Sequence, residues 1–216
     1  MTGEDSIQHL KRNKEFAPLV KKHPKPELDR GMNPFQALVR SIVYQQVSGK
    51  AAATIFKRFT ELFPVSTKGG VNKKFPTPEA VLAVPFIKLR EAGLSGQKAT
   101  YIQDLAQKFA DGTIKHRAFK KMTSDEVITH VTQVKGIGVW TAHMFLMFTL
   151  NRPDILPTGD LGIQKGFQIV YGLKKLPTPA QMETLAKNWR AHASAASWYL
   201  WRVADDAKLI VKKPRP

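Results

Sequence analysis

The stretch Val134-Lys135-Gly136-Ile137-Gly138-Val139-Trp140-Thr141-Ala142 decides the fold of this chain of 216 residues. Its Gly-Ile-Gly turn lets the backbone reverse tightly, and the apolar residues 139–150 that follow predict a central buried helix. Glycines at such a turn also let backbone N–H groups approach an anionic phosphate. The alternative is that Gly136 and Gly138 merely join two packed helices.

Charge and composition point to a nucleic acid as the partner. Lys and Arg number 34 against 17 Asp and Glu, which gives a formal net charge of +17 and suits a polyanion. The longest strongly apolar stretch, residues 144–150, is far too short to span a bilayer, so we expect no membrane role. The absence of cysteine excludes disulfides, a cysteine nucleophile, thiolate zinc sites and iron-sulfur clusters.

The two ends of the chain bear on its location. Residues 1–10 carry Glu4, Asp5 and His9 and lack the apolar centre of a secretory signal, so we expect an intracellular protein, nuclear if the source is a eukaryote. The basic end, residues 212–216, is either a nuclear address or a solvated tail.

Helix start signals recur along the chain. Each is a Ser, Thr or Asn, several before a proline, followed by apolar residues at helical spacing. They are Asn33-Pro34, Ser48, Thr77-Pro78, Thr123 with Glu126, and Thr178-Pro179. No period-2 strand pattern stands out, so the sequence predicts an all-α fold. The basic stretch 65–74 is either a loop that touches a nucleic-acid backbone or a solvated excursion.

Four ordered motifs carry a family resemblance. They are Ser-Ile-Val-Tyr-Gln-Gln-Val-Ser-Gly-Lys-Ala-Ala at 41–52, Lys-Gly-Ile-Gly-Val-Trp-Thr-Ala at 135–142, Leu-Pro-Thr-Gly-Asp-Leu at 156–161 and Ala-Ser-Trp-Tyr-Leu-Trp at 196–201. Over residues 33–201 the chain resembles the helix-hairpin-helix (HhH-GPD) superfamily of DNA glycosylases. Within it, the chain is most similar to the 3-methyladenine DNA glycosylase II (AlkA-type) family, in the compact form without an N-terminal β domain.

The resemblance implies a two-lobed helical fold with a basic DNA-binding cleft between the lobes. We expect a central helical lobe over residues 33–138, ending in the hairpin. A C-terminal lobe over residues 139–207 would carry the catalytic acid, with residues 1–32 packed against it. Residues 208–216 would form a basic tail.

The resemblance also implies that Asp160 is the catalytic carboxylate, and the chemistry agrees. Breaking an N-glycosidic bond creates an oxocarbenium-like sugar, which an anion stabilises while it orients or deprotonates water. A purine alkylated at N3 or N7 is already cationic and leaves without a general acid. The alternative is that Asp160 is a plain helix N-cap, a role compatible with catalysis.

Trp140 decides the subclass. In relatives that also cleave the strand, the matching position is a lysine that forms a Schiff base with the deoxyribose, which tryptophan cannot do. The resemblance therefore implies a monofunctional hydrolase without abasic-site lyase activity. It also places Trp140, Trp201 and Met144 in the pocket for the flipped base, where aromatic faces stack on a cationic purine. We assign the other two tryptophans, Trp189 and Trp198, to core packing.

Base flipping leaves a gap in the duplex that a side chain must fill. The turn of residues 45–48, here called the wedge turn, matches the family's wedge, with Gln46 and Val47 as plug and wedge and Ser48 at the groove edge. The alternative is a buried Val47 beside a solvated Gln46. The turn of residues 94–98 is a candidate second probe.

The DNA-binding hairpin is expected from a short set of residues: Lys135, Gly136, Ile137, Gly138 and Thr141. The resemblance implies a structural Na⁺ or K⁺ ion held by the backbone carbonyls of Thr132, Val134 and Ile137. No cofactor is required, and the histidines lack the spacing of a zinc site. Three positions depart from the pattern of close relatives: Gly159 replaces a second acid, Ala193 replaces a basic residue, and Met144 stands where some relatives have a pocket tyrosine.

The function expected from the resemblance is hydrolysis of 3-methyladenine and 7-methylguanine from duplex DNA, by a monomer that flips the base and so initiates base excision repair. A first rival is a non-catalytic protein that binds lesions or abasic sites. A second is a general DNA-architectural protein, which leaves the placement of Asp160 and Trp140 unexplained.

Overall fold

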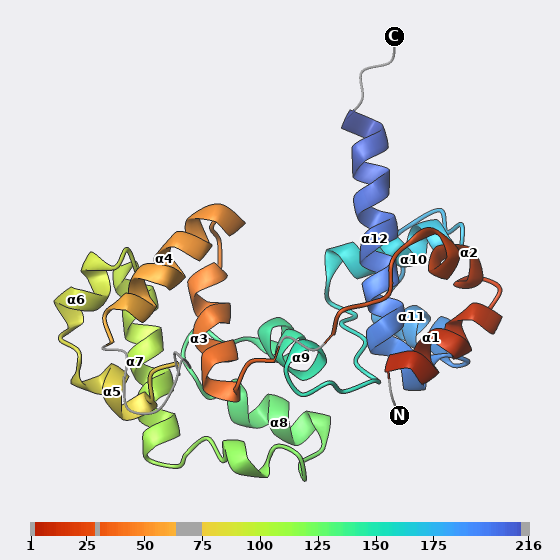
Figure 1. The fold of residues 1–216 in the computed structure, drawn as a ribbon. Coiled ribbons are helices and arrows are strands. Elements are labelled where there is room, and N and C mark those ends of the chain that lie inside the picture. The colour runs from red at the N-terminus through yellow and green to blue at the C-terminus, as the bar shows by residue number, and fades with distance from the viewer. Residues whose placement is uncertain (1–2, 29–30, 64–74, 213–216) are drawn as a thin grey trace. The chain divides into compact units, whose positions relative to one another are not determined.

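The computed structural model describes residues 3–28, 31–63 and 75–212, with side chains up to residue 207. Within these ranges the regular elements are helices and no strand is present, so the all-α prediction is confirmed (Figure 1). The basic stretch 65–74 and the last residues of the chain, 213–216, lie outside the described residues. In chain order the helices are α1 (Gly3–Arg12), α2 (Ala17–Lys22), α3 (Pro34–Tyr44), α4 (Gly49–Glu61), α5 (Pro78–Ala83), α6 (Phe86–Glu91), α7 (Gly96–Ala110), η1 (His116–Ala118), α8 (Ser124–Val131), α9 (Val139–Phe148), α10 (Leu161–Val170), α11 (Pro179–Ala186), η2 (Arg190–His192) and α12 (Ala193–Lys212).

The helix starts lie where the capping residues predicted them. Asn33, Ser48 and Thr77 each accept a hydrogen bond from a backbone N–H in the first turn of the helix that follows. Thr123 and Thr178 form complete capping boxes with Glu126 and Gln181. A side-chain cap of this kind stabilises a helix by about 0.5–2 kcal/mol, which explains why short segments of this chain begin helices at defined residues.

The chain divides into two compact units. One unit contains residues 31–145, and the other contains residues 1–30 together with residues 146–216. The division falls inside α9, later than the boundary after Gly138 that the sequence suggested. Because α9 is mostly apolar, with Thr141 and His143 as its polar residues, no clear change in local pattern marks the boundary between the two units.

Helix α7 is the centre of the unit formed by residues 31–145. It contacts α3, α5 and α6, and it buries an apolar face against them. The fully buried side chains of this core include Leu38, Ile42, Phe59, Val81, Leu89, Ile102 and Leu105. Burying one such side chain contributes about 1.5–3 kcal/mol, so α7 is held firmly by its packing.

Helix α12 is the centre of the other unit, with α10, α1 and α2 beside it (Figure 1). Its closest neighbour is α10, because Gly166 leaves space for the backbone of α12; a Cβ at Gly166 would lie 2.6 Å from the carbonyl oxygen of Leu200. Trp189 is buried in this core, as predicted, and donates its indole N–H to the Tyr171 hydroxyl. Trp198 packs at its edge.

The C-terminal end of α12 corrects one expectation. Residues 208–216 were expected to form a basic tail, whereas the helix continues to Lys212. No helix of the described residues has the length and apolar character needed to cross a membrane.

Candidate active site

Asp160 is the N-cap of α10 and is hydrogen-bonded on one defined oxygen. Its Oδ1 accepts the backbone N–H of Ile163 at 2.9 Å and the indole N–H of Trp201 at 2.9 Å. One donor comes from the helix that Asp160 begins and the other from α12. Two donors from separate helices fix the rotation of the carboxylate, so Asp160 is both a cap and an oriented, half-buried acid.

The loop that carries Asp160 is fastened to α12 by two buried serines. The Ser194 hydroxyl donates to the carbonyl of Arg152 at 2.5 Å and accepts the backbone N–H of Ile155 at 3.1 Å. Ser197 donates to the carbonyl of Ile155 at 3.4 Å. Both serines are completely buried. Sequence reasoning missed them, because small polar residues in an Ala-rich helix give no signal of what they bond.

Gly162 allows Trp201 to reach the carboxylate. A Cβ at Gly162 would lie 2.8 Å from Cδ1 of Trp201 and 3.0 Å from Oδ1 of Asp160. The Trp201 ring also lies nearly parallel to that of Phe148, with centroids 6.3 Å apart and an interplanar angle of 23°. Sequence reasoning missed Gly162 as well, although an isolated glycine inside a helical pattern is a recognisable sign of close approach.

Two of the departures from the family pattern, Ala193 and Gly159, have different surroundings. Ala193 is fully buried in the α12 core, so a basic side chain at this position would displace core residues. Gly159 is exposed, and a Cβ there would meet no atom within 4 Å. The surroundings of Gly159 therefore leave room for the side chain of a second acid beside Asp160.

The hairpin, residues 135–138, rests on α7. Gly136 has φ of +80°, and a Cβ there would lie 2.1 Å from the Tyr101 ring. The backbone N–H of Lys135 donates to Oδ2 of Asp104 at 2.9 Å. Burial acts to raise the pKa of Asp104, but hydrogen bonds from Lys108 and from Lys135 outweigh it and lower that pKa overall. The ionised carboxylate is thus a fixed acceptor for the hairpin backbone.

The other predicted hairpin residues differ in accessibility. Gly136 and Gly138 are exposed, and the Lys135 side chain is exposed beside them. Ile137 and Thr141 are buried, and the N–H of Ile137 is already bonded to the carbonyl of Val134. The exposed glycine backbone and the Lys135 side chain are therefore the parts of the hairpin that a phosphate can reach.

The wedge turn is exposed and has a strained backbone. Gln46 has φ of +54°, a left-handed conformation that costs a non-glycine residue energy and that gathers at functional sites. Val47 is 40% exposed, so the alternative of a buried Val47 is wrong. Ser48 caps α4 through the N–H of Ala51. A protruding apolar side chain on a fixed turn is what a wedge requires.

The remaining pocket candidates lie on α9. Trp140 is 53% exposed and Met144 is half-buried. Both belong to the unit of residues 31–145, whereas Asp160 and Trp201 belong to the other. The role of each in a base pocket stays a prediction.

The described residues contain no cluster of three or more His, Asp or Glu side chains suited to a metal. For an alkali cation, the expected ligands are the carbonyls of Thr132, Val134 and Ile137. The carbonyl of Val134 accepts the N–H of Ile137 at 3.1 Å, which leaves that oxygen a second lone pair for an ion. The ion itself stays a prediction.

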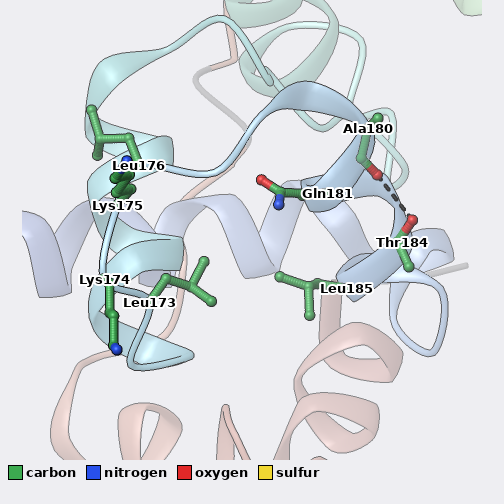
Figure 2. Close-up of a pocket in the computed structure, with 8 residues that line it drawn as sticks. All are labelled: Leu173, Lys174, Lys175, Leu176, Ala180, Gln181, Thr184 and Leu185. Carbon is green, nitrogen blue, oxygen red and sulfur yellow. Dashed lines mark hydrogen bonds between the residues drawn. The ribbon is translucent and has the colours of Figure 1, made fainter.

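A separate apolar pocket of about 690 Å³ lies between α11 and the loop that precedes it (Figure 2). Figure 2 shows Leu173 and Leu185 approaching it from two sides, with Lys174 at the edge. It contains neither a carboxylate nor an aromatic ring.

Comparison with known proteins adds to this geometry. The model of a family described as HhH-GPD superfamily base excision DNA repair protein matches residues 39–191. The chain is 35% identical over 185 residues to DNA-3-methyladenine glycosylase 1 of Schizosaccharomyces pombe, and the alignment covers 85% of this chain and 77% of that protein.

Two solved structures are similar along almost the whole chain. One is the 3-methyladenine DNA glycosylase Mag1 of Schizosaccharomyces pombe in complex with abasic DNA, with a TM-score of 0.73, 32% identity and coverage of 93% of this chain and 97% of that one. The other is a DNA-3-methyladenine glycosidase of Bacillus halodurans, with a TM-score of 0.80, 32% identity and coverage of 94% and 91%.

Proposed function

Because the chain belongs to the HhH-GPD superfamily of base excision DNA repair proteins, we propose that it is a monofunctional DNA glycosylase that hydrolyses alkylated purines from duplex DNA. The substrate class follows from the relatives, which are named for 3-methyladenine. The observation that carries the proposal is the fixed carboxylate of Asp160, held at 2.9 Å by donors from both α10 and α12.

The proposed chemistry needs one carboxylate. As the bond between C1′ and the purine nitrogen breaks, its electron pair stays with the cationic purine, which departs neutral. The positive charge then passes to the sugar, where the anion of Asp160 stabilises it. Water adds to C1′ and gives a proton to Asp160, so the products are a free base and an abasic site. A departing neutral purine requires no general acid.

The residues around Asp160 orient its carboxylate. The Trp201 indole and the Ile163 amide hold the carboxylate before substrate arrives, so that no reorganisation is needed when charge develops. The buried serines of α12 hold the loop around it. Trp201 therefore acts through its N–H edge as well as through any face it presents to a base.

The other functional elements follow from the hairpin and the wedge turn. The exposed glycine backbone of residues 136–138 and the Lys135 side chain grip a phosphate without reading sequence. Val47 enters the duplex and Gln46 fills the gap that the flipped base leaves. Trp140 and Met144 line the base pocket, and the protein acts as a monomer. A Na⁺ or K⁺ ion on the carbonyls of Thr132, Val134 and Ile137 would supply positive charge beside the bound phosphate.

Trp140 underlies the proposal that the strand is left intact. The lysine that would attack the sugar in bifunctional relatives is replaced by tryptophan here, which has no amine to form a Schiff base. The product is then an unbroken strand with an abasic site.

The test is incubation of the protein with a methylated duplex under single-turnover conditions, with the free bases identified by mass spectrometry. We expect 3-methyladenine and 7-methylguanine, and a strand that breaks only after alkaline treatment. Strand cleavage without alkali would contradict the monofunctional assignment. Tight binding of an abasic analogue without any release would instead identify a non-catalytic lesion binder. Equal affinity for damaged and intact duplex at matched salt would identify an architectural protein.

A further inference from the structure

Lys98 on α7 bonds the backbone that leads into the wedge turn. Its ammonium donates to the carbonyl of Val43 at 2.7 Å and to the carbonyl of Gln45 at 2.7 Å. These carbonyls lie at the C-terminal end of α3, where backbone acceptors lack partners within the helix and the helix dipole favours a cation. Lys98 thus closes the end of α3 just where the chain leaves it for Gln46.

The same lysine has no acidic partner among the described residues. It is half-buried, and burial lowers its pKa. Burying part of an ammonium costs free energy unless its N–H groups are hydrogen-bonded. The bonds to the two carbonyls offset this cost, and they also fix the position of the ammonium. Lys98, the last residue of the turn of residues 94–98, is therefore directed at the wedge turn; the role of that turn as a second probe stays a prediction.

The wedge turn is also bonded to the hairpin. The side chain of Gln45 donates to the carbonyl of Gly136 at 2.8 Å. The hairpin is in turn fixed to α7 by the Tyr101 ring against Gly136 and by Asp104, which accepts the N–H of Lys135. Lys98, Tyr101 and Asp104 are spaced by three residues, so they share one side of α7.

This arrangement accounts for the strained backbone of Gln46. A non-glycine residue keeps a positive φ only where the surrounding structure holds it there. Gln46 follows directly after a residue that is bonded through both its carbonyl, to Lys98, and its side chain, to Gly136. The strain is thus imposed by two independent bonds from two elements.

We propose that Lys98 is a positioning residue that locks the wedge turn to the hairpin through α7, so that gripping the phosphate and entering the duplex occur as one rigid step. The proposal rests on the proposed function for its premise that the turn enters DNA. It predicts that loss of the Lys98 bonds impairs wedge insertion much more than it impairs binding to intact duplex.

The test uses the full chain and a duplex with a tetrahydrofuran abasic analogue beside 2-aminopurine, whose fluorescence rises when the wedge disturbs its stacking. Lys98→Met removes the donor and keeps an unbranched apolar side chain. We expect an insertion rate at least about tenfold lower, in line with the loss of charge-assisted hydrogen bonds, with affinity for intact duplex changed less than about twofold. Lys88→Met is the control, since it removes the same charge from an exposed lysine paired with Glu91 on α6.

A second variant keeps the test valid if Lys98→Met folds poorly. Gln45→Leu breaks the bond to Gly136 and leaves Lys98 in place, and it should also slow insertion without changing the melting temperature of the protein by more than a few degrees. Wild-type insertion rates in both variants would overturn the proposal, as would an equal loss of affinity for intact and abasic duplex.

Base release from methylated DNA, measured in parallel with the wild-type protein, distinguishes a failure of the Lys98 proposal from a failure of the glycosylase assignment. Release without any insertion signal would overturn this proposal alone. An insertion signal that Lys98→Met abolishes, without base release by the wild type, would support the lock and contradict the glycosylase assignment.

Discussion

The indole N–H of Trp201 donates a hydrogen bond of 2.9 Å to Oδ1 of Asp160, the oxygen that also receives the backbone N–H of Ile163. The residue that the sequence suggested as a stacking face is therefore bonded through its edge to the predicted catalytic acid. This contact joins two helices, α10 and α12, at the point where the chemistry is proposed to occur.

Replacing Trp201 by phenylalanine keeps an aromatic ring and removes the donor. Hydrogen bonds to charged groups contribute about 1.5–3 kcal/mol, so we expect Trp201→Phe to slow single-turnover base release by about tenfold or more. Trp198→Phe is the matched control, because Trp198 lies on the same helix against Arg202. Equal rates in the two variants would show that the indole N–H does not orient Asp160.

Adding a methyl group at Gly162 should disrupt the hydrogen bond between Trp201 and Asp160 by steric displacement. In Gly162→Ala the new Cβ would clash with Trp201 and crowd Asp160, so base release should fall about tenfold or more, as it does when the hydrogen bond is removed. Gly159→Ala adds a methyl group to open space at the residue directly before Asp160 and should have the smaller effect. In the Trp201→Phe background, Gly162→Ala should cost less than it does alone; strict additivity would contradict a shared mechanism.

Alanine at the two hairpin glycines should affect different properties: protein stability at Gly136 and DNA affinity at Gly138. Gly136→Ala combines a positive φ with a Cβ inside the Tyr101 ring, so it should lower the melting temperature clearly, with a cost of several kcal/mol. Gly138→Ala meets no atom of the protein within 4 Å and should leave the melting temperature almost unchanged. It should nevertheless weaken DNA binding, because the methyl group occupies the space through which a phosphate approaches. Unaltered DNA affinity in Gly138→Ala would remove the hairpin from the interface.

A histidine pair should make stability depend on pH. His9 and His192 stack with centroids 4.2 Å apart, and burial, followed by the neighbouring His9, lowers the pKa of His192 against an opposing effect of Asp5. The unfolded state therefore takes up the proton first as the pH falls. Stability should be full above about pH 6.5, the ordinary histidine value, and decline below it. Melting curves between pH 8 and pH 5 should show a smaller decline for His192→Gln than for the wild type, and identical declines would contradict this assignment.

Much of the fold could be predicted from the sequence because its signals are local. Caps such as Asn33 and the box of Thr123 with Glu126 act within one helical turn, so their residue types are sufficient to place a helix start. The short helix α6 was not predicted, because Pro85 at its start carries no side-chain cap. The division between the two compact units falls inside the mostly apolar helix α9, where the sequence pattern gives no boundary signal.

The site was only partly predictable, for a related reason. Asp160 and the hairpin glycines stand in recognisable motifs. The contacts of Gly162, Ser194 and Lys98 could not be predicted, because each is made with a residue that is distant in sequence, and a single sequence carries no record of such a partner. The long-range bonds therefore had to come from the structure, while the catalytic role of Asp160 stays a prediction that the family resemblance implies.

The most direct test of the central claim compares wild type and Asp160→Asn in single-turnover release of 3-methyladenine from a methylated duplex. Asparagine keeps an oxygen acceptor for Ile163 and Trp201 but removes the negative charge. The account predicts base release at least about a hundredfold slower, with the melting temperature and the affinity for an abasic analogue largely unchanged. Release at the wild-type rate by Asp160→Asn would contradict it.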